Sequence, residues 1–146
     1  MSETPFPFFN DNSEKVALVE GANKHTYSEI NDRINLFSSG ILRDREDLNE
    51  ERIAFFLPAS LDYVTAMHGV WRAGGIAVPL NVASAVSELD HYLTCANVTR
   101  LIAGSQYHDS LKELCNSLEI ELLSVGEVLA EKPRELPLID SERRAM

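Results

Sequence analysis

The stretch WRAGGIAVPLN, residues 71–81, decides how the chain is organised, because its paired glycines fit two opposite interpretations. Gly74 and Gly75 could cradle a phosphate, or they could end a helix and begin a strand. The preceding residues are apolar nearly all round, as in a buried helix, and IAVPL is typical of a short strand. The pair then lies at the carboxyl end of a helix, where the helix dipole is negative. We therefore predict a helix terminator and no phosphate site.

Strands and helices also alternate on the N-terminal side of this stretch. The run RIAFFLP (52–58) is apolar throughout and ends at proline, which is typical of a central strand in a parallel sheet. Ser60 is placed to cap the helix that follows it. Upstream, Thr26 stands three residues before Glu29, the spacing of a capping box, and apolar residues then recur at helical spacing. Before that helix, KVALVE and HTYS flank the turn GANK and predict a β-hairpin.

The same alternation continues on the C-terminal side. Ser84 or Ser87 is expected to cap the next helix, and Asn97 is expected to end it in a left-handed conformation. The predicted elements are a helix over 84–96, a strand over 100–105, a helix over 107–118 and a strand over 120–125. The fold class is therefore α/β, a mostly parallel sheet with helices on both faces, preceded by a β-hairpin. We expect an irregular arm over 1–13, an α/β subdomain over 14–132 and a proline-broken, charged linker over 133–146.

Composition excludes several classes of function. The 146 residues carry a net charge of −10, which argues against a nucleic-acid partner, since phosphate contacts require clustered Lys and Arg. No apolar run approaches the roughly 18 residues that would cross a bilayer, so we expect no membrane span. The N-terminus does not have the pattern of a signal peptide, and neither cysteine belongs to a C-x-x-C motif. These features predict a cytoplasmic location, with Cys95 and Cys115 as buried or half-buried thiols.

A search for catalytic groups yields no candidate catalytic, cofactor-binding or metal-binding residue. The chain contains no G-x-G-x-x-G, no G-x-S-x-G elbow and no Cys/His cluster of zinc spacing. Asp90 and His91 are adjacent on a helix and point in different directions, and Glu50 and Glu51 are interpreted as a solvated run. A cysteine nucleophile paired with a histidine stays open as a minor alternative. His68 is interpreted as a core or boundary residue. The four histidines and the four serines near element ends do not cluster in the sequence: His25, His68, His91, His108, Ser28, Ser60, Ser84 and Ser105.

The order of these elements resembles the N-terminal part of the adenylate-forming acyl-CoA synthetases, over roughly residues 14–146. The most specific piece is GVWRAGGIAVPLN, which is similar to the Ala-Gly-Gly and Val-Pro-Leu-Asn segment of that family. The Thr-Tyr and Glu start of the first helix also fits. Asn97 stands where many members have glycine, and both residues tolerate the left-handed conformation. The sequence SERRAM resembles, over a short stretch, the branch that acts on malonate and methylmalonate.

The resemblance implies a parent ligase that uses ATP, Mg²⁺ and CoA to convert a carboxylic acid into an acyl-adenylate and then a thioester. In that family the phosphate loop begins just after the segment that SERRAM resembles, so we expect this chain to be an architectural N-terminal subdomain that is inactive alone. Its expected partner is the remainder of the parent enzyme, with self-association through an exposed apolar face. The alternative is a free-standing α/β binding or scaffold module without catalysis.

Overall fold

The computed structural model describes residues 14–130 and 136–137 of the chain. A four-stranded sheet lies at its centre, in the order β4-β3-β5-β6, and every neighbouring pair is parallel. A separate antiparallel hairpin precedes the sheet. The strands are β1 (Val16–Glu20), β2 (Asn23–Thr26), β3 (Arg52–Phe56), β4 (Ile76–Pro79), β5 (Arg100–Ala103) and β6 (Glu121–Leu123).

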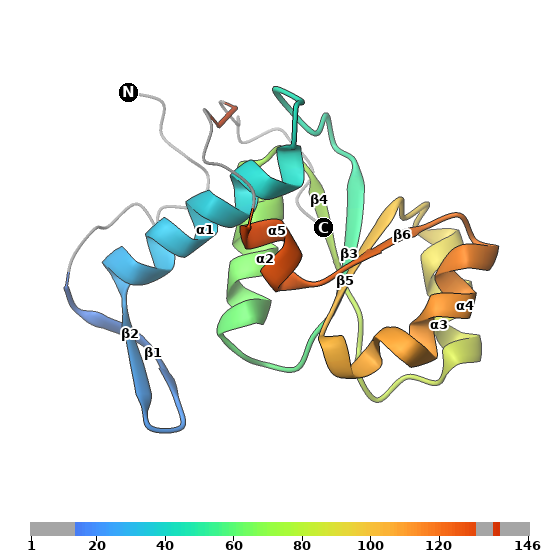
Figure 1. Cartoon of the computed structure of the whole chain (residues 1–146), viewed down its shortest axis with the longest axis horizontal. Coiled ribbons are helices and arrows are strands. Elements are labelled where there is room, and N and C mark those ends of the chain that lie inside the picture. Colours follow the sequence, from blue (N-terminus) through green and yellow to red (C-terminus); the bar gives the residue numbers. More distant parts are fainter. Residues whose placement is uncertain (1–13, 131–135, 138–146) are drawn as a thin grey trace.

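Helices cover both faces of this sheet (Figure 1). One core cluster joins the sheet to α1, α2 and α5, and a second cluster on the opposite face joins it to α3 and α4. The helices are α1 (Tyr27–Leu42), α2 (Leu61–Arg72), α3 (Val86–Cys95), α4 (His108–Ser117) and α5 (Val125–Leu129). The predicted fold class is confirmed, with a parallel sheet, helices on two faces and a hairpin in front.

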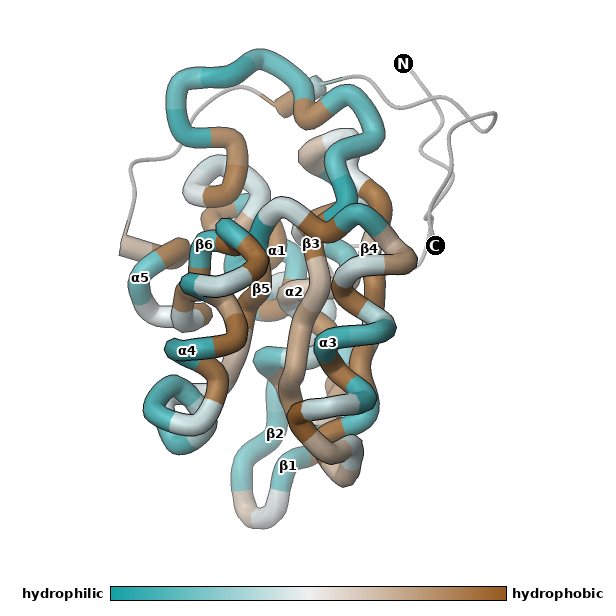
Figure 2. The backbone as a smooth tube through the Cα atoms, turned by 90° about the vertical axis from the view of Figure 1, so that its right-hand side faces the viewer, coloured by the Kyte–Doolittle hydropathy of each residue, from teal (hydrophilic) through white to brown (hydrophobic). Residues whose placement is uncertain are grey.

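The strand sequences explain why the sheet is central. Residues 53–56 of β3 and all four residues of β5 are buried, so side chains on both faces of these strands are removed from water. The apolar strands run through the middle of the molecule, whereas the hairpin is largely hydrophilic (Figure 2). Side-chain burial on two faces requires cover on two faces, and the alternating helices supply that cover.

The predicted helix boundaries on the N-terminal side are confirmed. The Thr26 hydroxyl accepts a hydrogen bond from the amide of Glu29, and the Glu29 carboxylate accepts one from the amide of Thr26, which completes the capping box. The Ser60 hydroxyl caps α2 by accepting from the amide of Tyr63. After α3, Asn97 adopts the predicted left-handed conformation with φ of 53°.

Two predictions near helix ends are wrong. The N-cap of α3 is Ala85, without a side-chain cap hydrogen bond, because Ser84 lies in the preceding turn and Ser87 lies inside the helix. The predicted strand over 120–125 ends at Leu123, where Ser124 caps the short helix α5 through the amide of Glu127. The predicted arm over 1–13 lies outside the described residues, as does the predicted linker over 133–146 apart from residues 136–137.

Candidate functional site

The glycine pair does not form a phosphate cradle, because its amides are already used within the fold. The amide of Gly74 donates to the carbonyl of Trp71 at 3.0 Å, and the amide of Gly75 donates to the carbonyl of Val70 at 2.9 Å. Gly74 has φ of 89°, a conformation that residues with a Cβ rarely adopt. The predicted helix terminator is confirmed, and the two N–H groups that a phosphate would need are engaged.

Close packing explains the second glycine. A Cβ on Gly75 would lie 2.8 Å from Cγ1 of Val70 and 2.9 Å from Cδ1 of Leu48, which is inside van der Waals contact. The carbonyl of Gly74 accepts a hydrogen bond from the amide of Glu50, and the carbonyl of Ala73 accepts one from the amide of Leu48. The Ala-Gly-Gly turn is thus joined to the loop that leads into β3, and its role in this chain is architectural.

The topology itself indicates where a ligand would bind. From the carboxyl end of β3 the chain turns to α2 on one face, and from the carboxyl end of β5 it turns to α4 on the other. In open parallel sheets, ligands bind where neighbouring connections diverge in this way. Here the ring of Phe56, the last residue of β3, packs edge to face against the ring of Tyr107 in the turn after β5, with centroids 4.8 Å apart. The candidate site is therefore the carboxyl edge of β3 and β5.

The polar groups at this edge are committed to local structure. The Ser60 hydroxyl donates to the carbonyl of Pro58 and accepts from the amide of Tyr63, so it is occupied as a helix cap. The ring Nε2 of His108 lies 3.1 Å from the carbonyl of Ala103, at the end of β5. Ser105 is exposed in a 3₁₀ turn over Ser105–Tyr107. Phe56 is buried and Tyr107 is half-buried, and the contacts described do not bring a nucleophile together with a base.

The four histidines lie on different elements. His25 is on β2, with Nδ1 3.8 Å from the carboxylate of Glu29, and His108 begins α4. His68 is buried in α2, as predicted, and its ring packs edge to face against Trp71. Burial, with the nearby charge of Arg72 as a second cause, lowers the pKa of His68 to about 4. A neutral core imidazole is the consequence.

The two cysteines differ from each other. Cys115 is buried, as predicted, and burial raises the pKa of its thiol. Cys95 is exposed, so the prediction of a buried or half-buried thiol is wrong for this residue. Its Sγ lies 3.7 Å from both ring nitrogens of His91, one helical turn earlier on α3. In the part of the chain that the structure describes, no three His, Cys, Asp or Glu side chains gather as a metal site.

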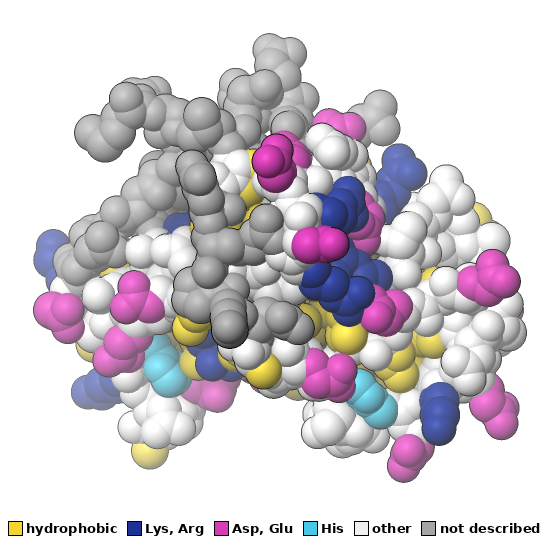
Figure 3. Space-filling view, turned by 45° about the horizontal axis from the view of Figure 1, so that its top comes forward, with side chains coloured by type: hydrophobic (Ala, Val, Ile, Leu, Met, Phe, Trp, Pro, Cys, Tyr) yellow, Lys and Arg dark blue, Asp and Glu magenta, His cyan; other side chains and the backbone are white. Residues whose placement is uncertain are grey.

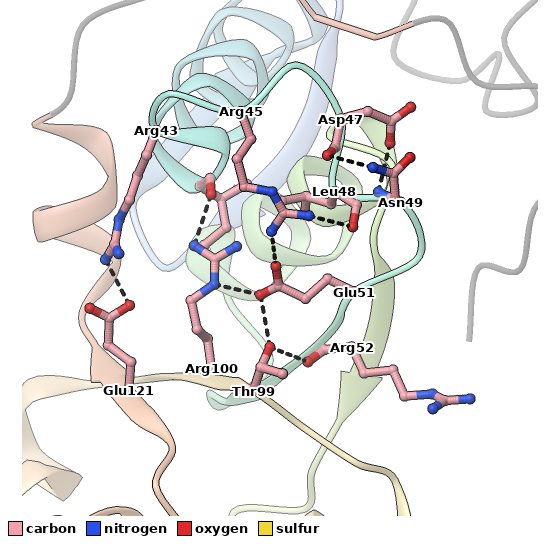
Figure 4. A network of polar contacts seen from close by, with 11 residues as sticks. Arg43, Arg45, Asp47, Leu48, Asn49, Glu51, Arg52, Thr99, Arg100 and Glu121 are labelled. Atoms are coloured by element: carbon pink, nitrogen blue, oxygen red, sulfur yellow. Dashed lines mark hydrogen bonds and ion pairs between the residues drawn. The ribbon is translucent and has the colours of Figure 1, made fainter.

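The strongest electrostatic cluster was missed by the sequence analysis. Glu51 was interpreted as solvated, but its side chain is only 14% exposed and accepts hydrogen bonds from Arg100, Thr99 and Arg45 (Figure 4). The Arg100 Nε lies 2.7 Å from Oε2 of Glu51, and its Nη1 donates to the carbonyl of Ile41 at 2.8 Å. The interpretation of Glu51 as solvated is wrong, because Thr99 and Arg100 at the start of β5, almost 50 residues away in sequence, and Arg45 in the loop before β3 all donate to its carboxylate.

Hydrogen bonding outweighs burial at Glu51. Burial alone would raise the pKa of this carboxyl, but hydrogen bonds from Arg100, Thr99 and Arg45 and the charge of Arg100 lower it below 4.5. The cluster lies at the amino ends of the strands, at the opposite edge from the candidate site. On the face of the molecule shown in Figure 3, basic and acidic side chains are interleaved. We therefore assign Glu51 and Arg100 to stability.

A groove of about 590 Å³ lies along the first half of α1. Arg33 in its wall forms an ion pair with Asp62 at 2.6 Å, and Glu29 belongs to the capping box. The groove has the volume of a ligand site, but Arg33 and Glu29 are already engaged in an ion pair and in a helix cap. Its lining residues are His25, Glu29, Ile30, Asp32, Arg33, Leu36, Leu61 and Leu129.

No helix among the described residues is both long and apolar enough to cross a membrane.

Comparison with solved structures places this fold among known enzymes. Apo MatB from Rhodopseudomonas palustris matches with a TM-score of 0.77 and 20% identity, over 92% of this chain and 29% of that one. The N-terminal subdomain of NpsA from Klebsiella oxytoca, solved with 3-hydroxybenzoyl-AMSN, matches with a TM-score of 0.76 and 17% identity, over 99% of this chain and 36% of that one. These similarities show a shared fold.

Sequence comparison extends the similarity. The mitochondrial malonate–CoA ligase ACSF3 of Mus musculus is 29% identical over 136 residues, which cover 88% of this chain and 23% of that protein. The Homo sapiens protein of the same name is 29% identical over 133 residues. The chain thus spans about a quarter of the length of these relatives. The family model described as "AMP-binding enzyme" matches residues 8–144. Because this match extends over most of the sequence, the chain belongs to the family of AMP-binding enzymes.

Proposed function

We propose that this chain forms the N-terminal structural layer of an acyl-CoA synthetase, an ATP-dependent ligase that joins a carboxylic acid to CoA. The observation that carries the proposal is the hydrogen bonding of the Gly74 and Gly75 amides. The family segment Ala-Gly-Gly is present, yet both glycine N–H groups donate to carbonyls in the last turn of α2. The segment supports a strand start and a helix end, which are architectural tasks.

The chemistry of the whole enzyme belongs to this proposal. Bound ATP would supply the adenylyl group, and Mg²⁺ would neutralise phosphate charge. The glycine turn does not fit a phosphate, because the amides of Gly74 and Gly75 donate to the carbonyls of Trp71 and Val70, and no group of three or more His, Cys, Asp or Glu side chains that could hold Mg²⁺ is gathered within residues 14–130 and 136–137. We assign no step of the reaction to a residue of this chain. The partner that completes the site is the remainder of the enzyme.

Malonate is the first acid that we propose to test. Two relatives named malonate–CoA ligases are 29% identical to this chain over most of its length. The acid pocket is not assigned to any side chain here, so this choice depends on the relatives and not on a contact. A short dicarboxylic acid therefore heads the substrate panel, followed by fatty and aryl acids. The cytoplasmic location stays a prediction.

The direct test is AMP formation by the purified chain with ATP, Mg²⁺, CoA and the acid panel. We expect no AMP above a control without acid, because the chain contributes structure only. Sustained, acid-dependent AMP formation would falsify the assignment.

Light scattering on the same sample tests self-association. Val16 and Val19 on the hairpin are 50% and 59% exposed, and such exposed apolar side chains favour association.

A chimera tests the structural role more positively. This chain replaces the matching N-terminal part of a malonate–CoA ligase, and CoA thioester formation is measured with malonate and with other acids. We expect an active chimera that keeps the acid preference of the recipient enzyme, since the N-terminal part supports the active site structurally and does not select the carboxylic acid. A folded but inactive chimera would contradict the proposal and favour a free-standing binding module.

A further inference from the structure

His91 and Cys95 form a pair of metal-ligand side chains on the exposed surface of α3. Residues four apart on a helix lie one above the other, and both side chains are exposed. Sγ of Cys95 lies 3.7 Å from Nδ1 and 3.7 Å from Nε2 of His91. Thiolate sulfur and imidazole nitrogen are the donors that Zn²⁺ and related cations prefer.

The separation of the donor atoms fits the coordination geometry. A tetrahedral Zn²⁺ holds a thiolate sulfur at about 2.3 Å and an imidazole nitrogen at about 2.0–2.1 Å. With a tetrahedral angle between those two bonds, sulfur and nitrogen stand roughly 3.6 Å apart. The observed distance of 3.7 Å from sulfur to each ring nitrogen is close to this separation, so a rotation of the His91 ring that turns one nitrogen toward Cys95 would suffice to place both donors around one ion.

Local freedom permits the final alignment. Because sulfur is equally far from both ring nitrogens, it faces neither nitrogen directly, and a rotation about χ2 of His91 is needed to turn one nitrogen toward an ion shared with Cys95. That torsion is broad for histidine, and an exposed ring rotates without displacing core residues. The neighbouring Asp90 carboxylate accepts a hydrogen bond from the hydroxyl of Thr94 at 3.3 Å, one turn along the same helix. The two ligands lie together before any ion arrives.

We propose that His91 and Cys95 form a two-ligand surface site for a borderline-soft divalent cation of the Zn²⁺ and Cd²⁺ class. No third His, Cys, Asp or Glu completes a cluster with them within residues 14–130. Water fills the remaining coordination positions, so the site is open and exchanges readily. Binding displaces the thiol proton, because the thiolate is the ligand. This site is separate from the carboxyl edge of the sheet and does not depend on the ligase assignment.

Cadmium titration of the reduced, chelator-treated full chain tests the site. The readouts are the ultraviolet charge-transfer band of a sulfur–cadmium bond and the proton released into a weak buffer, with Zn²⁺ as competitor. We expect saturation at one Cd²⁺ per chain. His91→Ala is expected to weaken binding by about tenfold or more while the band persists at high Cd²⁺, and Cys95→Ser is expected to abolish the band.

Matched variants separate this site from other thiols and histidines. Cys115 is 1% exposed, so Cys115→Ala is expected to leave the titration unchanged. His25→Ala removes a histidine on another element and is also expected to have no effect. Far-ultraviolet circular dichroism verifies that each variant is folded. A His91→Ala titration identical to that of the unmodified chain, or a band that survives Cys95→Ser, would overturn the proposal.

Discussion

Replacing Glu51 with Gln removes the charge from the cluster that ties β3 to β5 while keeping the size of the side chain. The Arg100 side chain is 9% exposed and faces Glu51 through a 2.7 Å contact from Nε. After the substitution, a guanidinium remains buried without a carboxylate, although its bond to the carbonyl of Ile41 is unchanged. The free energy of unfolding should therefore fall.

The magnitude follows from the burial of each partner. Removing one member of a buried ion pair costs about 3–5 kcal/mol, because the remaining charge is desolvated and uncompensated. The Arg45 side chain that also contacts Glu51 is 44% exposed, so water screens part of the loss. We therefore expect a decrease of about 2–3 kcal/mol in the free energy of unfolding, a large share of the 5–15 kcal/mol typical of a domain. The corresponding decrease in Tm is roughly 5–10 °C.

Urea unfolding, followed by fluorescence of the single tryptophan, measures this loss. The matched control is Glu121→Gln, since Glu121 pairs with Arg43 at 2.8 Å but both side chains are about half exposed. We expect less than about 1 kcal/mol for the control. Equal losses in the two variants would refute the reasoning that burial makes the Glu51 pair important.

The pH dependence provides a second readout with a definite sign. Because the pKa of Glu51 is lowered in the folded state, the unfolded chain binds the proton first as the pH falls. The contribution of Glu51 is complete above its unfolded pKa near 4.5 and declines as the pH falls through the lower folded value. The difference between the unmodified chain and Glu51→Gln should therefore shrink below pH 4.5. A constant difference down to pH 3 would count against the assignment.

Two further predictions concern packing and titration. A Cβ on Gly40 would run into the backbone carbonyl of Val128 in α5, so Gly40→Ala should cost about 1–3 kcal/mol in urea unfolding, whereas Gly126→Ala, whose Cβ would have only one neighbour at 3.9 Å, should be near neutral. Equal effects would show that the two helices do not approach as described. For His68, a folded pKa of about 4 against 6.5 when unfolded means that stability is retained above pH 6.5 and falls as the pH drops towards 4. An NMR titration midpoint near 6.5 would disprove the burial of that imidazole.

The elements with local signals could be predicted from the sequence. Thr26 and Glu29 stand at capping-box spacing, and Gly74 follows an apolar helix, so each marks a helix end without help from distant residues. Helix α5 could also have been found, because Ser124 and Glu127 share that spacing. A five-residue helix is too short for hydrophobic periodicity to reveal it, and the preceding apolar run was interpreted as strand.

The features that were missed depend on distant residues. Glu51 follows another glutamate, a pattern typical of solvated surface, and only the packing of β5 beside β3 brings Arg100 and Thr99 to it. Cys95 was predicted to be a buried or half-buried thiol because it belongs to no C-x-x-C motif, but it is exposed on α3, next to His91. The carboxyl edge with Phe56 and Tyr107 likewise emerges from strand order, which single-sequence patterns do not specify.

An NMR titration of the isotopically labelled chain with Mg·ATP tests the central claim most directly. The amide signals of Gly74 and Gly75 report whether their N–H groups meet a phosphate. We predict that both signals stay unchanged through the titration, because these amides donate to the carbonyls of Trp71 and Val70. A saturable shift of these two signals, without change in the rest of the fold, would contradict the account that this part of the enzyme is structural.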